Sequence, residues 1–184
     1  YLGANRGFEV LLNEGNWVNG EISKTKEYIL DYIKVYHNDK LNQFPFVFEM
    51  EDDVTLEVKE GKLEDYLVKS VEKLIENKGL LACRFTDRID EFDRINRLNA
   101  KYGLNNKKAI KIEGENNYFL DSDHCSFRNY IARTRDFYQM SRILLHNFDK
   151  LHPSAETSVT QALMALSDFE TPFLCWETSL ISHK

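Results

Sequence analysis

The chain has 184 residues, of which 42% are hydrophobic and 12% are aromatic, and it contains three prolines. This length suits one compact domain with a real core, and the composition argues against a disordered chain. The net charge of -6 excludes a broad basic surface for a phosphate backbone, so we expect no nucleic-acid partner, although a site for one bound nucleotide needs only local charge.

The cysteines indicate a reducing compartment such as the cytoplasm. Cys83, Cys125 and Cys175 are odd in number, far apart and without a CxxC pair, which favours buried thiols over a disulfide framework or a zinc site. No run approaches the roughly 18 apolar residues of a transmembrane span. The chain begins at Tyr1 and not at Met. We therefore treat residues 1–184 as one domain that can be an excerpt of a longer chain.

The first half of the chain predicts alternating strands and helices. Residues 8–12 form a short apolar run that suits a buried strand, and a Gly/Asn loop follows in which Trp17 is the aromatic residue expected to line a pocket. Ser23 is the expected N-cap of a helix that extends to Tyr36. Residues 46–56, FVFEMEDDVTL, then predict one buried strand that ends in acidic residues.

The second half continues this alternation. Residues 63–76 carry apolar side chains at helical spacing and predict a helix that ends at Gly79. Further strands are expected at residues 80–85, 108–114, 117–122 and 172–182, and further helices at residues 90–103, 134–151 and 154–167. The pattern predicts an α/β fold, with a mixed, mostly parallel central sheet between helical layers.

The acidic end of residues 46–56 is the most informative motif. Glu51 and Asp53 project to the same side of an extended segment, while Asp52 projects to the other. Adjacent carboxylates repel one another unless a cation or hydrogen-bond donors take up their charge, and such oxygen ligands suit Mg²⁺ or Mn²⁺. Ligands of open α/β sheets also bind at the carboxyl ends of strands. A solvated acidic turn is the alternative explanation for these three residues.

The order of the segments FEVLLNEGNWVNGEIS, helix and FVFEMEDDVTL resembles the nucleotide-sugar half of GT-A glycosyltransferases. It is most similar to lipopolysaccharide and procollagen galactosyltransferases, where a GEIG-type segment opens a helix and an LEDD-type strand follows. The matching positions are Gly20, Glu21, Ile22, Ser23, Glu51, Asp52 and Asp53. The remainder of the chain agrees only in the order of its elements, and YLGANRG is not the apolar strand with which a GT-A domain begins.

The resemblance implies a GT-A three-layer sandwich and a UDP- or GDP-sugar donor held with Mn²⁺ or Mg²⁺. Asp53 is the metal ligand it implies first, Glu51 supports the metal directly or through water, and Asp52 reaches the ribose or the sugar. Contacts to the base or diphosphate are expected from the N-terminal region, at Asn5, Arg6, Asn13, Asn16 and Gly20. His183, in the terminal ISH segment, is similar to the histidine from which many GT-A enzymes take a further metal ligand, although an exposed terminal histidine would look the same.

Sugar transfer with inversion, the outcome we expect, also needs a carboxylate that removes a proton from the acceptor hydroxyl. The candidates are Glu156, at the start of a predicted helix, and Asp121 and Asp123 in the segment NYFLDSDHC. Glu156 also suits a helix N-terminal acid that follows Ser154 as N-cap. Arginines at positions 128, 133 and 135 can hold a diphosphate, but we expect at least two of them to pair with surface acids.

The sequence thus predicts a hexosyltransferase-type enzyme that transfers a sugar to a hydroxyl of a glycan or glycoprotein. A sugar nucleotidyltransferase is the first alternative, and it should carry a glycine-rich basic loop after its first strand, which is not visible. A transferase-like glycan-binding module without catalysis is the second alternative.

Overall fold

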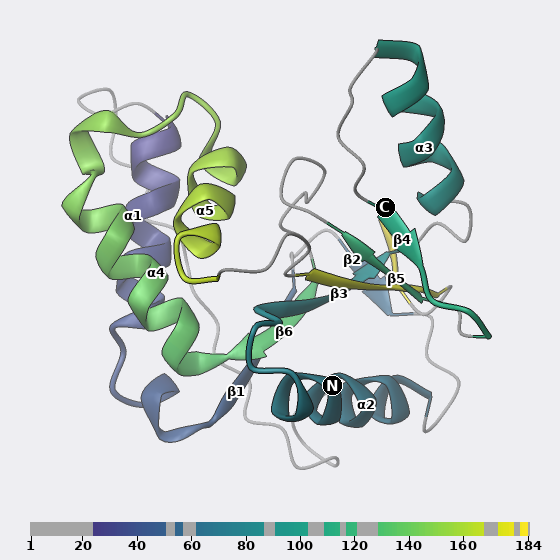
Figure 1. Cartoon of the computed structure of the whole chain (residues 1–184). Helices are drawn as coiled ribbons and strands as arrows, with labels where there is room; N and C mark the ends of the chain where they lie inside the picture. Colours follow the sequence, from purple (N-terminus) through teal and green to yellow (C-terminus); the bar gives the residue numbers. More distant parts are fainter. Residues whose placement is uncertain are drawn as a thin grey trace.

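The computed structural model describes residues 24–50, 54–56, 62–86, 91–102, 109–114, 117–120, 129–167, 173–178 and 181–183. These residues form a mixed α/β fold, as predicted (Figure 1). A six-stranded sheet lies between helices, and a second sheet of two strands stands beside it.

The main sheet has the strand order β1-β6-β3-β7-β5-β4. Its strands, in chain order, are β1 (Phe46–Glu49), β3 (Ala82–Thr86), β4 (Ala109–Lys111), β5 (Asn117–Leu120), β6 (Tyr130–Arg133) and β7 (Phe173–Glu177). The second sheet pairs β2 (Val54–Leu56) with β8 (Ile181–His183) in antiparallel fashion.

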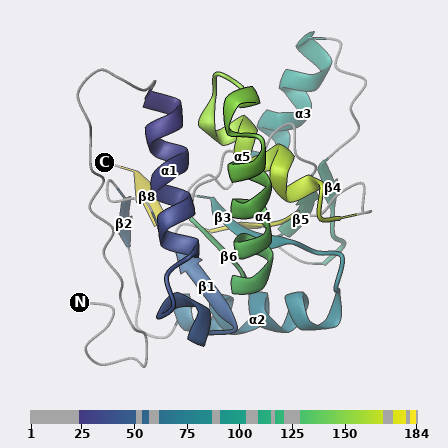
Figure 2. The same cartoon turned by 90° about the vertical axis from the view of Figure 1, so that its left-hand side faces the viewer.

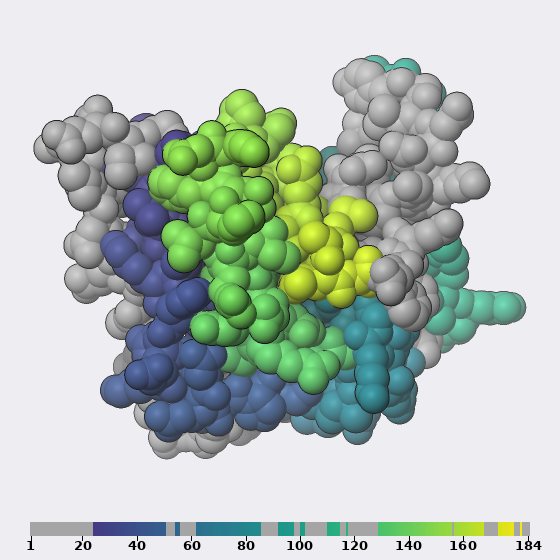
Figure 3. Space-filling model, turned by 60° about the vertical axis from the view of Figure 1, so that its left-hand side comes forward, coloured from purple at the N-terminus to yellow at the C-terminus, as the bar shows by residue number. Residues whose placement is uncertain are grey.

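The helices cover both faces of the main sheet. They are α1 (Lys24–Tyr36), α2 (Lys62–Glu76), α3 (Glu91–Tyr102), α4 (Thr134–His146) and α5 (Ala155–Met164), with short 3-10 turns η1 (Leu41–Gln43) and η3 (Phe148–Lys150). Helices α1, α4 and α5 pack together on one face, and α2 lies along the other (Figures 1 and 2). In the space-filling view α1, α4 and α5 form one continuous face of the molecule (Figure 3).

Two apolar cores follow from the alternation of side chains along the strands. In β7, Phe173 and Cys175 belong to the core under α1, α4 and α5, whereas Leu174 and Trp176 belong to the core over α2. Because successive strand residues point to opposite faces, a strand buried on both sides must be apolar throughout. The run FLCW of β7 has this character, and all five residues of the strand are buried.

Helix α2 shows how local sequence specifies one of these cores. Leu63, Leu67 and Leu74 lie on one face and are buried, while Lys and Glu side chains occupy the opposite face. On the sheet side, the indole Nε1 of Trp176 donates a hydrogen bond to Ser70 Oγ at 2.8 Å. Trp176 is therefore a core residue, whereas Trp17, the aromatic residue expected to line a pocket, lies outside the described residues.

The prediction of a mostly parallel sheet is wrong. Among the described strands only β3 and β7 pair in parallel, and the other four neighbouring pairs are antiparallel. Strands β4 and β5 follow one another through a short turn at Gly114, whose φ of +77° suits glycine, and a short turn can join only antiparallel neighbours. Hydrophobic patterns predict the strands themselves, but they carry no information about strand direction.

Two predicted strands are each divided between the two sheets. Residues 46–56 contain β1 in the main sheet and β2 in the small one, and residues 172–182 likewise contain β7 and the start of β8. Strand β6 was not predicted at all, although it lies between β1 and β3. Its four residues are all buried, so the segment shows no alternation, and it runs directly into α4.

Cys83 and Cys175 are buried free thiols, as predicted. Burial raises the pKa of the Cys83 thiol, which keeps this side chain protonated and unreactive. In the part of the chain that the structure describes, no helix is long and apolar enough to cross a membrane.

Candidate functional site

Strand β2 directly follows the acidic motif of residues 51–53 in the sequence, and strand β8 is the terminal ISH segment. These two strands pair with each other. Strands β2 and β8 lie side by side (Figure 2), and in the register of this pair Val54 is the Cα partner of His183. Directly opposite residues of an antiparallel pair have Cα atoms about 4.5–5.5 Å apart. Asp53, the last residue of the acidic motif, immediately precedes Val54 in the sequence and lies outside the described residues.

Most of the predicted site residues lie outside the described residues. This group comprises Asn5, Arg6, Asn13, Asn16, Gly20, Glu51, Asp52, Asp53, Asp121 and Asp123. Of the others, His183 is the last residue of β8 and Glu156 lies in the first turn of α5, and the structure describes the backbone of both but not their side chains. The described side chains, which do not include residues 51–53, contain no group of three His, Cys, Asp or Glu residues that could hold a metal.

The N-terminus of α5 has the predicted cap. The Ser154 hydroxyl accepts a hydrogen bond from the backbone N–H of Thr157 at 3.3 Å. This bond satisfies one of the free N–H groups of the first turn. Glu156, one residue before Thr157, is therefore placed where the helix dipole favours a carboxylate.

A carboxylate that the sequence analysis did not select lies two residues before the acidic motif. Glu49 is the last residue of β1, and its carboxylate accepts hydrogen bonds from three tyrosine hydroxyls. Tyr32 Oη donates to Oε1 at 2.6 Å, Tyr130 Oη donates to Oε2 at 2.7 Å, and Tyr36 Oη also donates to Oε2. We call these four residues the Glu49 cluster.

The members of the Glu49 cluster come from three elements and are held in place by packing. Tyr32 and Tyr36 lie one turn apart on α1, and Tyr130, on β6, is the register partner of Glu49. The rings of Tyr36 and Tyr130 both stack on Phe137 of α4, with centroid distances of 4.8 Å and 5.1 Å. Since Tyr36, Tyr130 and Phe137 are almost completely buried, these rings have little freedom to move.

The environment of the Glu49 cluster keeps its three phenols neutral. Burial raises the pKa of Tyr32, Tyr36 and Tyr130 well above the ordinary range, and the negative charge of Glu49 raises these pKa values further. Three donated hydrogen bonds meanwhile take up most of the acceptor capacity of the carboxylate. The cluster thus joins three buried tyrosines of the apolar core to a half-buried carboxylate at the end of β1.

We expect three of the nine tyrosines to resist ionisation in the folded protein. Their pKa values are raised in the folded state, so their contribution to stability is present below the unfolded pKa of about 10 and is lost as the pH rises above it. A tyrosinate absorbance titration, followed in parallel by circular dichroism, should show these three phenols ionising only as the protein unfolds. Ionisation of all nine near pH 10 with an intact fold would contradict this expectation, and the denatured chain supplies the reference curve.

A signal for the Glu49 cluster was present in the sequence. Glu49 is a single acid directly after the apolar run FVF, and the preceding helix carries tyrosines at positions 28, 32 and 36, four residues apart. This spacing places the three hydroxyls along one helix face. The assignment still required the tertiary structure, because Tyr130 comes from β6, which was not predicted.

A fully buried carboxylate, Glu177, lies at the end of β7. Its Oε1 accepts a hydrogen bond from the backbone N–H of Phe92, in the first turn of α3, at 3.0 Å, and its Oε2 pairs with Lys111 Nζ at 2.7 Å. The side chain is only 3% exposed. These contacts attach α3 and β4 to the sheet and give Glu177 a structural role.

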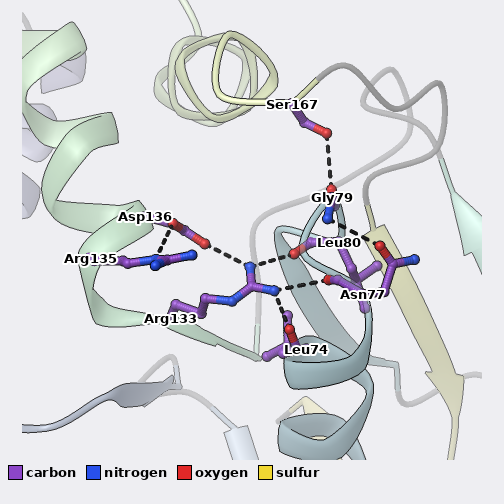
Figure 4. Close-up of polar contacts among 8 residues, drawn as sticks. All are labelled: Leu74, Asn77, Gly79, Leu80, Arg133, Arg135, Asp136 and Ser167. Carbon is purple, nitrogen blue, oxygen red and sulfur yellow. Dashed lines mark hydrogen bonds and ion pairs between the residues drawn. The ribbon is translucent and has the colours of Figure 1, made fainter.

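The structure corrects the expectation for one of the arginines. Arg133, expected on the surface or at a diphosphate, is buried and binds the carboxyl end of α2 (Figure 4). Its guanidinium donates to the carbonyls of Leu74, Asn77 and Leu80, at 2.9 Å and 2.7 Å for the latter two, and it pairs with Asp136 at 2.8 Å. Arg135 is a surface residue as expected and contacts Asp136 at 3.3 Å, and Arg128 lies outside the described residues.

A surface groove of about 460 Å³ lies at the amino end of β1. Its walls include Phe44, Phe46, Ile75, Lys78 and Arg135. It includes Arg133 and Arg135, two of the arginines considered for a diphosphate, but, among the described residues, none of the predicted metal ligands or catalytic carboxylates, and it lies at the opposite end of β1 from Glu49. We therefore place the candidate site at the β2–β8 pair and the adjoining end of β1.

Comparison with known proteins adds no family assignment. The chain matches no protein-family model and, at a significant level, no curated protein.

Proposed function

We propose that this protein is a metal-dependent glycosyltransferase of the GT-A type that uses a UDP- or GDP-sugar. The observation that carries this proposal is the register of β2 and β8, in which His183 is the partner of Val54, the residue that follows Asp53 in the sequence. The segment that follows the acidic motif and the ISH segment are more than a hundred residues apart in the sequence, and they pair in one small sheet. If the acidic motif were only a solvated turn, this pairing would not be expected.

The donor set at this place fits a small divalent cation. Asp53, Glu51 and His183 offer carboxylate and imidazole ligands, which suit Mn²⁺, and the open positions of such a site are filled by phosphate and water. When bound, the cation would stabilise the negative charge of the leaving nucleoside diphosphate. Asp52, which projects to the opposite side of an extended backbone, is the residue we assign to the ribose or the sugar.

The remaining roles belong to residues that hold the substrates and move a proton. Glu156 is our first candidate for the base that removes the acceptor proton, with Asp121 and Asp123 as the alternatives. Base and diphosphate contacts are assigned to Asn5, Arg6, Asn13, Asn16 and Gly20. The acceptor is a hydroxyl of a glycan or glycoprotein, and inversion at the anomeric carbon follows from a single displacement assisted by a base.

The fold supports this proposal in its general arrangement. Helices cover both faces of a mixed sheet, and the acidic motif follows the carboxyl end of a sheet strand, where α/β proteins bind ligands. The sheet differs from the expected one because antiparallel pairs predominate.

A panel of nucleotide sugars tests the proposed function directly. We expect one UDP- or GDP-sugar to raise the thermal midpoint of the protein in the presence of Mn²⁺ and not in the presence of EDTA, because a ligand stabilises the state that binds it. Slow release of free sugar from the same donor should accompany the shift. Pyrophosphate release from a nucleoside triphosphate and a sugar phosphate would instead identify a nucleotidyltransferase, and a shift with glycans alone would identify a binding module.

A further inference from the structure

We propose that the surface groove at the amino end of β1 binds an acidic peptide segment of a partner protein. In this proposal an apolar side chain of the peptide packs against Phe44 and Ile75, and a carboxylate of the peptide pairs with Lys78 and Arg135. The inference does not rest on the proposed function, because the groove lies at the opposite end of β1 from Glu49.

Exposed apolar side chains gather at this groove. Phe44 is 37% exposed and Ile75 is 62% exposed, and both line it. Val68, which is 57% exposed, lies seven residues before Ile75 on α2 and therefore on the same side of the helix. Three of the five exposed large apolar residues in the described part of the chain thus lie at the groove or along the helix that forms its wall. Such a patch beside a concave surface is typical of a site that binds another molecule.

The charge of the groove is opposite to that of the whole protein, whose net charge is -6. Its described lining residues include three cations, Lys78, Arg133 and Arg135, and no acid. Asp136 pairs with both arginines and so balances one of their two charges. Lys78 is exposed and forms no ion pair with a described residue. The groove therefore retains positive charge, and the partner that complements it is acidic.

The walls of the groove are fixed to one another before any ligand binds. The Arg133 guanidinium donates to carbonyls at the carboxyl end of α2 and pairs with Asp136 of α4, so it joins the two helices (Figure 4). The backbone N–H of Thr134 donates to the carbonyl of Pro45 at 3.1 Å, which attaches the segment before β1 to the start of α4. A preformed groove of this kind loses little conformational entropy when it binds a ligand.

The shape of the groove favours a peptide over a small molecule. Its volume of about 460 Å³ is within the range of small-molecule sites, but such sites enclose most of their ligand, whereas Phe44 and Ile75 remain open to solvent. A peptide can place one apolar side chain against these residues and its carboxylates beside the exposed Lys78 and Arg135, whose side chain is 72% exposed. Apolar anchors and acidic groups that meet basic side chains both recur in peptide recognition.

Fluorescence anisotropy with three labelled decapeptides tests the chemistry of the partner. The first contains glutamate, leucine and phenylalanine, the second has lysine in place of every glutamate, and the third has serine in place of every apolar residue. We expect saturable binding of the first alone, weakened at about 1 M salt, where the Debye length falls to about 3 Å. Equal binding of either altered peptide, or no saturable binding of the first, would overturn the proposal.

Two changes to the groove test the place of binding. Replacing Lys78 and Arg135 together by glutamate should raise the dissociation constant of the first peptide by about tenfold or more, because like charges would then face each other. Ile75→Ser should weaken binding as well. All three side chains are exposed, and glutamate at position 135 suits the first turn of α4, so we expect circular dichroism to show the parent fold.

The matched controls lie on exposed positions outside the groove. Arg142→Glu combined with Lys150→Glu makes the same change in net charge, and Leu145→Ser, at a side chain that is 52% exposed, matches Ile75→Ser. These variants should bind the first peptide as the parent does.

The remaining outcomes separate the acidic peptide from other occupants. Equal binding by the groove variants and their controls would place the peptide elsewhere and overturn the proposal. If the double variant does not fold, Lys78→Glu alone and Ile75→Ser must each weaken binding. A dimer in sedimentation velocity that Ile75→Ser dissociates would instead identify a second copy of the chain as the occupant, and displacement of the peptide by octanoate at equal concentration would identify a small-molecule site.

Discussion

Replacing Asp53 by alanine should abolish Mn²⁺-dependent nucleotide binding and leave the fold intact. Asp53 is the first metal ligand in the proposed site, and it precedes the β2–β8 pair directly. Without this carboxylate the proposed cation would lose a ligand oxygen and the negative charge that attracts it. The donor diphosphate would then lose the cation that balances its charge. A ligand at a hundred times its dissociation constant stabilises a protein by about 2.7 kcal/mol, and this entire increment should disappear.

The measurement is the Mn²⁺-dependent thermal shift with UDP or GDP, together with calorimetry. Asp39→Ala is the matched control, because Asp39 is an exposed aspartate in the turn after α1. Both variants should keep the circular dichroism spectrum of the parent. Undiminished binding of nucleotide and Mn²⁺ by the Asp53 variant would remove the central claim, whereas unfolding of that variant would show that the motif is needed for the fold.

The second large effect concerns stability and is expected for Arg133→Met. The arginine side chain is only 9% exposed and donates hydrogen bonds to three carbonyls around the carboxyl end of α2. Methionine retains much of the volume but removes the side-chain donor of these carbonyls and one of the two arginine partners of Asp136, and it removes a positive charge from the negative end of a helix dipole. Breaking such a buried charged network typically costs about 3–5 kcal/mol.

Urea unfolding gives the change in the free energy of unfolding, and Arg135→Met provides the control. Arg135 is two residues away, also contacts Asp136, and has a side chain that is 72% exposed. Its loss should change stability by less than about 1 kcal/mol, since exposed ion pairs contribute little. Similar losses in the two variants would show that the carbonyl contacts of Arg133 contribute no more than a surface ion pair.

The helices could be predicted well from the sequence, because their apolar spacing records which face is buried. Helix α2 begins one residue before its predicted start and ends where predicted, and α1 and α5 also lie inside predicted helices. The strands were harder to predict from the sequence. Residues 46–56 look like one strand because both parts are apolar or β-branched, yet β1 and β2 belong to different sheets. Only pairing partners distant in the chain decide that division.

The candidate site shows the same limit. The sequence suggested His183 and the acidic motif from a resemblance, but it had no means of placing them next to each other. The register of β2 with β8 supplies that relation for the backbone. The contacts of Glu49 could not be predicted, because its partners come from α1 and from β6. The spacing of residues within one segment does not show contacts between three separate elements.

By itself, the sequence determined that the chain forms an α/β fold in which Cys83 and Cys175 are buried free thiols, and it led to the hypothesis that residues 51–53 bind a cation. These properties depend on composition and short-range periodicity, which each segment carries alone. The tertiary structure decided the strand directions, the burial of Arg133, the Glu49 cluster and the pairing of β2 with β8. Those properties depend on contacts between residues far apart in the sequence, which no local pattern specifies.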